Sequence, residues 1–327
     1  MFRKKDIIYA IYREGGFSKA AKMLHIAQPS LSVMVAGVEK ELGASLFDRS
    51  TNPVRLTDIG AKYIECCENI NMIEDDFRAY MDEVRGIERG NIFIGSNSLY
   101  MSNVIPSIVA RYSEKHPQIH INLYDYDTPQ LISSLNSGAL DLAIDNLAED
   151  NPSLDSYYLG TEFLLFAVPL DSPVNERLSK YSYSYFDITR GVHVSSNRRD
   201  LNDLYAFRNL PFILLQDGFD TRKRVDAIFE DYGISVHADY EFNQLSSAFG
   251  MAASGIGATV VSDTLVRHSP DWGSKMRYYS LRNEEFTRAV FCYSKKNRML
   301  GKAISEFIEI SREQSPFTIF EDPHAAL

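Results

Sequence analysis

A long apolar heptad repeat restricts the fold of this chain more than any other feature. No proline occurs from Thr57 to about residue 85, and apolar side chains recur there at alternating spacings of 4 and 3: Ile59, Tyr63, Cys66, Ile70, Ile73, Phe77, Tyr80 and Val84. A helix that packs only within its own chain rarely keeps so strict a repeat, so the pattern predicts a self-associating coiled coil. We therefore expect a dimerisation helix over residues 58–88, started by Thr57 as N-cap, with the first seven of these side chains in its seam.

The residues before this helix differ in charge from those after it. Residues 1–57 carry nine basic and five acidic side chains, a net charge of +4. The other 270 residues carry 25 basic and 39 acidic side chains, a net charge of −14. A small basic segment on an acidic body indicates a module that binds a polyanion.

Residues 1–57 have the pattern of three short helices followed by a hairpin. Gly15-Gly16 ends the first helix, Ser18 is placed to cap the second, and Pro29 suits the first turn of the third. Two extended pieces, around residues 45–48 and 54–56, then flank a turn that contains Pro53. Two helices joined by a tight turn and followed by a hairpin predict an all-α winged helix-turn-helix, in which the third helix enters the major groove of DNA.

A series of short motifs at fixed spacings covers about the first 65 residues: Phe17-Ser18-Lys19-Ala20-Ala21, Leu24, Gln28-Pro29-Ser30-Leu31-Ser32, Val38-Glu39, Leu42-Gly43, Leu46-Phe47-Asp48-Arg49 and Leu56-Thr57-Asp58-Ile59-Gly60. This series resembles the LysR-type transcriptional regulators. The resemblance implies a winged helix-turn-helix, a long dimerisation helix and a two-lobed α/β effector domain similar to periplasmic binding proteins. It also implies assembly into homo-oligomers, usually tetramers.

The third helix departs from the family in its groove-facing positions, where Val33, Met34, Ala36 and Gly37 stand in place of the usual Arg, Lys, Gln or Asn. One interpretation is that Gln28 and Ser32 read bases while Val33 or Ala36 touches a thymine methyl group. The alternative is that Val33 and Met34 pack inward or against a neighbouring subunit. In the first interpretation, the phosphates of the DNA are contacted by Lys19, Lys22, Arg49 and Arg55. The full set of expected DNA-binding residues is Ser18, Lys19, Lys22, Gln28, Pro29, Ser30, Ser32, Val33, Arg49 and Arg55.

The rest of the chain alternates predicted strands and helices. Strands at 91–95, 119–124 and 140–144 separated by helices predict a mainly parallel sheet. We expect a first lobe over 91–163 and 268–313, a second lobe over 164–267, and a loose tail over 314–327. Residues Leu178–Arg199 are rich in tyrosine and serine and are interpreted as an inserted loop. The order of these elements, with Ser254-Gly255-Ile256-Gly257, also resembles the effector domain of the same family.

Hydroxyl and amide side chains gather at the predicted starts of helices in both lobes. Parallel sheets bind ligands at the carboxyl ends of their strands, and helix N-termini there favour anions. We therefore expect a small, anionic effector between the lobes, although each side chain taken singly can also be a plain helix cap. The expected effector-binding residues are Ser96, Asn97, Ser98, Thr128, Gln216, Asp217, Gly218 and Asn243.

Other functional classes find little support in the sequence. It contains neither a P-loop nor a nucleophile elbow, and Gly255-Ile256-Gly257 follows a predicted helix where a dinucleotide-binding motif would follow a strand, so we expect no enzyme. Three cysteines, two of them adjacent, predict reduced thiols, and we expect neither metal nor cofactor. The longest apolar run, Phe163–Leu170, is too short to span a membrane, and the N-terminus lacks a secretory signal.

These patterns predict a cytoplasmic transcription regulator that binds double-stranded DNA, a small-molecule effector and further copies of itself, with no membrane partner. The alternative is a solute-binding module that carries an appended basic domain and serves transport. The expected absence of a secretory signal, which an exported module needs, argues against this alternative, and so does the heptad repeat, which it does not need.

Overall fold

The computed structural model describes residues 1–51, 53–84, 90–147, 151–195, 198–202 and 204–319, with residues 75, 76, 78, 79 and 82–84 described by their backbone alone. The chain forms two compact units, one built mainly on residues 1–88 and the other mainly on residues from 89 onward. We call them the head and the body and describe each by itself.

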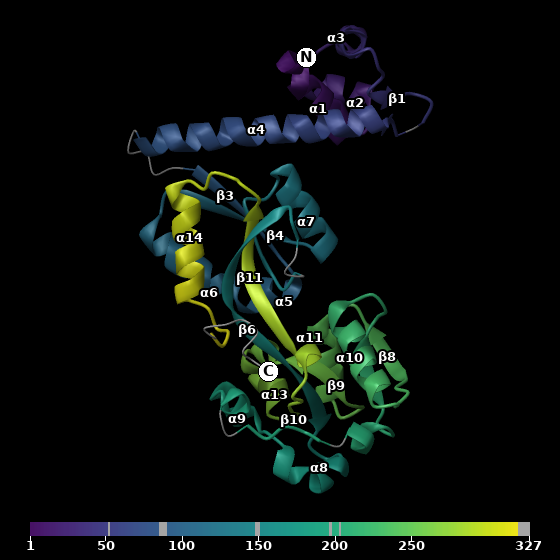
Figure 1. Ribbon diagram of the computed structural model, residues 1–327, viewed down its shortest axis with the longest axis vertical. Helices are drawn as coiled ribbons and strands as arrows, with labels where there is room; N and C mark the ends of the chain where they lie inside the picture. The colour runs from purple at the N-terminus through teal and green to yellow at the C-terminus, as the bar shows by residue number, and fades with distance from the viewer. Residues whose placement is uncertain (52, 85–89, 148–150, 196–197, 203, 320–327) are drawn as a thin grey trace. The chain divides into compact units, whose positions relative to one another are not determined.

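The head contains three short helices, a two-stranded hairpin and one long helix, as the sequence predicts (Figure 1). The elements are α1 (Lys5–Glu14), α2 (Phe17–Met23), α3 (Gln28–Leu42), β1 (Phe47–Asp48), β2 (Arg55–Leu56) and α4 (Asp58–Val84), after a 3₁₀ turn at Phe2–Lys4. Strands β1 and β2 are antiparallel and form the wing. Gly15 ends α1 and Gly43 ends α3, each in the left-handed region with φ of 67° and 73°.

Side chains at the helix starts confirm one capping prediction and correct another. Thr57 Oγ1 accepts a hydrogen bond from Gly60 N at 3.0 Å and donates one to Ser45 O at 2.7 Å, so Thr57 caps α4 and also joins it to the wing. The prediction for Ser18 is wrong, because α2 already begins at Phe17 with Gly16 as its N-cap. Ser18 instead lies in the first turn of α2 with its side chain exposed.

The first turns of α4 belong to the core of the head. Tyr63, Ile64 and Cys67 are buried there against side chains of α1, α2 and α3. The Tyr63 ring stacks on Phe2 with 4.9 Å between centroids, and its hydroxyl donates to Met1 O at 3.0 Å. The prediction that Tyr63 faces a partner helix is therefore wrong, because the head itself covers this part of the apolar stripe. Burial raises the pKa of the Cys67 thiol to about 12, so this thiol stays protonated at neutral pH.

The first lobe of the body contains the predicted parallel β-α-β-α-β unit. Its elements are β3 (Gly90–Ser96), α5 (Ser98–Asn103), α6 (Ile105–Lys115), β4 (Ile119–Asp125), α7 (Thr128–Ser137) and β5 (Leu142–Asp145). Strand β3 pairs in parallel with both β4 and β5. Helix α14 (Lys302–Glu313) lies with α6 on one side of this sheet and α7 lies on the other (Figure 1). Tyr112 connects α6 to α14, since its hydroxyl donates to Ala303 O of α14 at 3.0 Å.

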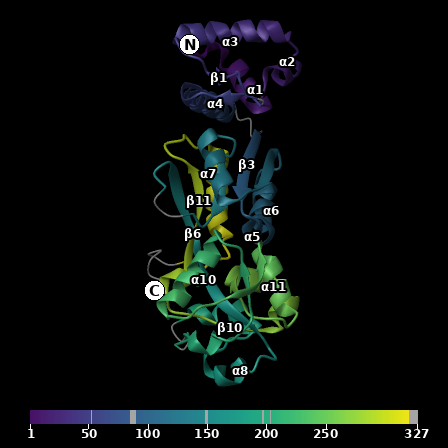
Figure 2. The ribbon, with the colours of Figure 1, turned by 90° about the vertical axis from the view of Figure 1, so that its right-hand side faces the viewer.

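Two long strands run from the first lobe into the second (Figures 1 and 2). These are β6 (Leu154–Pro169) and β11 (Thr287–Lys295), which pair with each other in antiparallel fashion and place β11 beside β5. The far half of β6 pairs with β9 (Thr259–Ser262) and β10 (Met276–Tyr279) on its two edges, both antiparallel. The sheet is therefore mixed where the sequence predicts a mainly parallel one, because the crossing strands enter it in the opposite direction.

The second lobe completes its core with short elements on both sides of this sheet. They are α8 (Val174–Arg177), α9 (Tyr185–Thr189), β7 (Phe212–Leu215), α10 (Asp220–Asp231), β8 (Ala238–Phe242), α11 (Leu245–Ala253), α12 (Asp263–Arg267) and α13 (Pro270–Gly273), with 3₁₀ turns at Ser179–Tyr181, Val192–Val194, Leu204–Phe207 and Glu284–Phe286. The lobe boundary predicted at residue 268 is wrong. Tyr278, Tyr279 and Phe286 are buried in the second lobe, and the chain returns to the first lobe only with β11.

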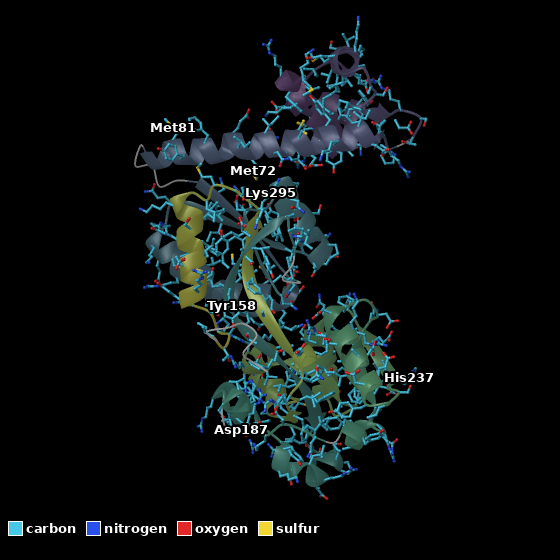
Figure 3. The ribbon with its side chains drawn as sticks, in the orientation of Figure 1. Met72, Met81, Tyr158, Asp187, His237 and Lys295 are labelled. Carbon is cyan, nitrogen blue, oxygen red and sulfur yellow. The ribbon has the colours of Figure 1, made fainter. Side chains whose placement is uncertain are left out.

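The predicted insertion and tail are both more ordered than expected. Within residues 178–195, Tyr183, Ile188 and His193 are buried, and Asp187 of α9 (Figure 3) closes a capping box with Ser184. Phe317 is also buried, and Thr318 O accepts from Thr161 N of β6 at 2.7 Å, so the segment up to Thr318 packs on the crossing strand. Residues 320–327 of the predicted tail, 85–88 of the predicted linker and 196–197 of the predicted insertion lie outside the described residues.

Candidate DNA-binding and effector sites

The first turn of α3 is exposed along the side opposite the core of the head. Leu31, Val35 and Val38 are buried against α1 and α2. Of the two predicted base-reading residues, Gln28 is exposed and Ser32 is half-buried, and the neighbouring Pro29 and Ser30 are exposed. Val33 is 72% exposed, which excludes the alternative in which it packs inward. A contact of Val33 with a thymine methyl group or with a neighbouring subunit stays open.

The four predicted phosphate-binding cations do not have equal surroundings. Lys19, Lys22 and Arg55 are exposed and form no ion pair with any described residue. Arg49 Nη2 instead lies 2.9 Å from Glu39 Oε2, and its guanidinium lies 4.9 Å from the centre of the Phe17 ring. Glu39 Oε1 accepts from Leu46 N at 2.8 Å, so Glu39 and Arg49 together hold the wing against α3. The sequence pattern missed this structural role, which makes Arg55 the better candidate for a phosphate contact.

The heptad stripe of α4 becomes exposed after its first turns have entered the head core. Ile73 is 65%, Phe77 62% and Tyr80 51% exposed, while Cys66 and Ile70 are half-buried. Ile59 at the other end of the stripe is also exposed. Large apolar side chains in one row on a helix surface mark an interaction site.

A cavity of about 400 Å³ lies between the two lobes of the body and is lined from both. Four predicted effector-binding residues line it, namely Asn97, Ser98, Thr128 and Asn243. The other four, Ser96, Gln216, Asp217 and Gly218, are not among the lining residues.

The four residues outside the lining have local reasons for their position. The buried Ser96 hydroxyl donates to Ile144 O at 2.6 Å, so it joins β3 to β5 and is not free to meet a ligand. Residues 216–218 form the turn before α10, and this helix starts at Asp220 with Phe219 as its N-cap. Arg222 Nη2 lies 3.1 Å from Asp217 Oδ1, which ties this turn to its own helix.

Three of the four predicted residues that line the cavity are bound to carboxylates. Asn97 Nδ2 donates to Asp145 Oδ1 at 2.5 Å, and Thr128 Oγ1 donates to Asp145 Oδ2 at 3.2 Å. Ser98 Oγ lies 2.8 Å from Asp125 Oδ2. Asp145 is almost fully buried, and this burial raises its pKa. The sequence offered one signal for Asp145, its place at the end of a buried strand beside the strand that precedes Asn97.

A second polar cluster joins the two lobes at the cavity, where Arg288, Thr221 and Asp220 belong to the lining. Arg288 of β11 contacts Glu162 of β6 through Nη2, and its Nη1 lies 3.2 Å from Thr221 Oγ1 and 3.3 Å from Asp220 Oδ2. Tyr100 of α5 donates from its hydroxyl to Glu162 Oε2 at 2.9 Å. Although burial by itself lowers the pKa of Arg288, the charges of Glu162 and Asp220 raise it well above its ordinary value. Sequence reasoning missed this cluster, because a single arginine in a strand has no pattern of its own.

Two further observations concern metals and membranes. Among the residues that the structure describes, no three His, Cys, Asp or Glu side chains stand close enough together to hold a metal ion. No helix within the described ranges has the length and apolar character needed to cross a bilayer.

A winged helix-turn-helix head followed by a two-lobed α/β body with a cavity between its lobes defines a ligand-responsive, DNA-binding transcription regulator. Comparisons with known proteins agree. Residues 2–61 match the family model described as "Bacterial regulatory helix-turn-helix protein, lysR family", and residues 85–182 and 190–316 match "LysR substrate binding domain". The chain belongs to the LysR family of transcriptional regulators. The second match leaves out residues 183–189, which include α9, and the insertion over Leu178–Arg199 stays a prediction.

Relatives and solved structures match over nearly the whole chain. The uncharacterised HTH-type transcriptional regulator YcgK of Bacillus subtilis is 30% identical over 312 residues, which cover 95% of this chain and 94% of that protein. A full-length OxyR variant from Pseudomonas aeruginosa is similar in fold, with a TM-score of 0.66, 21% identity and coverage of 96% and 94% of the two chains. Full-length CbnR in complex with its target DNA has a TM-score of 0.59 at 16% identity, covering 96% and 99%.

Proposed function

We propose that this regulator binds paired sites on duplex DNA as a homo-oligomer, reads bases with the first turn of α3, and changes its DNA binding when a small molecule occupies the cavity between its lobes. The exposed first turn of α3, with Lys19 and Lys22 on α2 and Arg55 in the wing, is the observation that carries this proposal. The DNA complex of CbnR, which has a similar fold, supports it.

The proposal has three further parts, which concern the contact between copies of the chain, the role of the body and the place in the cell. The exposed row of Ile73, Phe77 and Tyr80 on α4 is the contact between copies of the chain. The body acts by binding its ligand and not by catalysis, in keeping with a family of regulators. The protein works in the cytoplasm, because duplex DNA is its partner. The alternative of a transport module is not favoured, since the winged head is part of the family match.

Substitutions in the head separate base reading from phosphate binding. An amide at the start of a recognition helix can bond adenine through two hydrogen bonds, so we expect Gln28→Ala to cost about 1–3 kcal/mol at the cognate site and to relax preference at one base pair. Arg55→Ala is expected to weaken binding to all sequences alike and to reduce the salt dependence by about one unit of log–log slope. Selection of bound duplexes from a random pool, followed by salt titrations, measures both effects.

The control for this experiment is Lys115→Ala, which removes an exposed cation from α6 in the body. We expect this variant to keep the sequence preference and the salt slope of the wild-type protein. Identical base preferences for wild type and Gln28→Ala would contradict the assignment of Gln28, and an unchanged salt slope in Arg55→Ala would contradict that of Arg55.

A further inference from the structure

The pairing of the two crossing strands is irregular at one place. The register shifts between Val290 and Phe291 of β11, whose partners on β6 are Gly160 and Tyr158. Leu159 is thus an extra residue on β6, next to Tyr158, which Figure 3 labels. A bulge of this kind bends its strand and leaves the extra residue outside the ladder of hydrogen bonds. The connection between the lobes therefore contains a bend shortly before β6 enters the second lobe.

Residues 315–318, which we call the strap, lie on this bend. Ser315 Oγ donates to Leu159 O at 2.6 Å, so the strap binds the carbonyl group of the extra residue. Thr161 N donates to Thr318 O at 2.7 Å, and Thr318 N donates to Thr161 O at 3.2 Å. These hydrogen bonds attach the strap to β6 on both sides of residue 160.

The strap also approaches the backbone of this strand closely. Gly160 has a φ of 142°, a conformation that favours glycine, and a Cβ atom at this position would lie 2.6 Å from Phe317 Cβ. This separation is much shorter than an ordinary contact between two carbon atoms. Glycine at position 160 therefore leaves the space that Phe317 occupies.

Phe317 joins the strap to the first lobe. Its side chain is buried, and its ring lies edge-on to that of Tyr100 in α5, with 5.5 Å between the centroids. Tyr100 is itself fully buried and donates from its hydroxyl to Glu162 Oε2 at 2.9 Å. Burial of two aromatic rings in this edge-to-face arrangement stabilises the contact between the strap and α5.

Arg267 joins the strap to the second lobe. Its Nη1 donates to Pro316 O at 2.7 Å, and its Nη2 lies 2.8 Å from Asp263 Oδ2 in the same helix, α12. Asp263 is buried, and its Oδ1 accepts from Phe163 N of β6 at 3.0 Å. A buried carboxylate therefore fixes one side of the guanidinium while the other side holds the strap.

The two helices that the strap contacts also contribute to the cavity between the lobes. Four residues of α5 and Leu265 of α12 are among its lining residues. A change in the distance between α5 and α12 therefore changes the width of the cavity. The strap holds this distance, because Phe317 packs on α5 while Pro316 is bonded to α12.

A chain end that packed on one lobe alone would stabilise that lobe and leave the lobes free to move. The strap instead contacts both lobes and the strand that connects them. Two packed lobes usually rotate about a few residues in their connecting segments. Such a rotation, if it opened the cavity, would have to break either the contact of Phe317 with Tyr100 or the bond of Arg267 to Pro316.

We propose that the strap is a restraint on the hinge between the lobes, which limits how far they move apart and so sets the widest state of the cavity. A ligand then acts on lobes that are already held close together, and it shifts them only by its preference for the narrower state. The inference goes beyond the proposed function, because it concerns the movement of the lobes and does not depend on DNA binding.

Two truncations of the full-length chain test this restraint. One ends at Gln314 and lacks the strap, whereas the other ends at Ile319, keeps the strap and is the matched control. Spin labels on Lys115→Cys of α6 and Glu230→Cys of α10, both at exposed positions, report the distance between the lobes by pulsed electron paramagnetic resonance. Cys66→Ser removes the half-buried thiol, and an excess of unlabelled chain keeps each measured pair of labels within one copy.

We expect one narrow distance distribution for the wild-type protein and for the chain that ends at Ile319. The chain that ends at Gln314 should give a distribution about twice as broad, extended toward longer distances, because its lobes rotate about the crossing strands alone. Equal widths in the three proteins would overturn the proposal.

Point variants keep the test valid if the shorter chain fails to fold. Phe317→Ala removes the contact with Tyr100, and we expect amides of β6 and α5 to exchange hydrogen about tenfold faster, with the head unchanged. Phe317→Leu keeps an apolar side chain at this position and should restore most of the protection. Ile319→Ala, at an exposed position beside the strap, is the control and should behave like wild type. Faster exchange spread evenly over the body in Phe317→Ala, with unchanged lobe distances, would contradict the restraint.

DNA binding, measured on the same proteins, keeps the two claims apart. A chain that ends at Gln314, shows broad lobe distances and still selects the wild-type DNA sequences would support both claims. Absence of specific DNA binding in the wild-type protein would contradict the proposed function, while the lobe distances would still decide the role of the strap.

Discussion

Aspartate in place of Ile73 or Phe77 is expected to dissociate the protein into folded monomers and to lower its affinity for paired DNA half-sites by about a hundredfold or more, the usual gain from linking two binding modules. Both side chains are more than half exposed in the single chain, so the head and the body do not need them for their own folding. In the proposed seam, each substitution would bury an unpaired charge against the partner helix, which makes separation the easier outcome. Light scattering and DNA titrations on one and two half-sites measure the two effects.

Two further substitutions in α4 make this result specific. Ala61→Asp places the same charge on an exposed position of the helix outside the seam, and we expect it to keep the wild-type assembly. Tyr63→Asp replaces a buried side chain of the head core and should unfold the head instead of releasing folded monomers. A folded Ile73→Asp protein with the mass of the wild-type assembly would show that the exposed stripe is not the contact.

Removal of the buried guanidinium in Arg288→Met is expected to lower the free energy of unfolding of the body by about 3–5 kcal/mol, the usual cost of breaking a buried ion pair by loss of one partner. Glu162 is fully buried, so its carboxylate would lose the charge that offsets its burial. The double variant Arg288→Met/Glu162→Gln should recover part of this loss, because neither of the two replacements leaves an unpaired charge at the buried pair. Denaturant unfolding of the single and double variants measures this coupling.

Arg224→Met provides the comparison for a more exposed arginine on the same carboxylate. Its side chain is 23% exposed and its Nε pairs with Asp220 at 2.9 Å. We expect this substitution to cost about 1 kcal/mol or less, as for other ion pairs near the surface. Equal losses in Arg224→Met and Arg288→Met would mean that burial of the Glu162 pair is not what makes Arg288 important.

The head was predictable in detail because its signals are local in the sequence. Gly15 and Gly43 end helices by their own backbone freedom, and Thr57 caps α4 through a bond to a residue three positions away. The heptad repeat shows which face of α4 is apolar, but it does not show what covers that face. Tyr63 therefore looked like a seam residue until the fold placed it under Phe2.

The body was less predictable because its site depends on contacts between distant segments. The order of strands and helices located Asn97 and Thr128 at the cavity, but their bonds to Asp145 depend on the alignment of β3 with β5. Likewise, Arg288 meets Glu162 only because β11 pairs with β6, 126 positions earlier in the chain. Pairings of this kind leave no periodic trace in a sequence, so the carboxylates of the lining and their ion pairs could be found only in the fold.

Footprinting on the DNA upstream of the protein's own coding sequence, at two salt concentrations, tests most directly whether this chain binds specific duplex DNA sites as a dimer. We predict protection of two half-sites whose centres lie about one helical turn, or a multiple of it, apart on the same face of the duplex. The affinity should fall steeply with added salt, and Phe77→Asp should lose the paired pattern. Uniform binding along the duplex, or a paired footprint that Phe77→Asp leaves unchanged, would contradict the account.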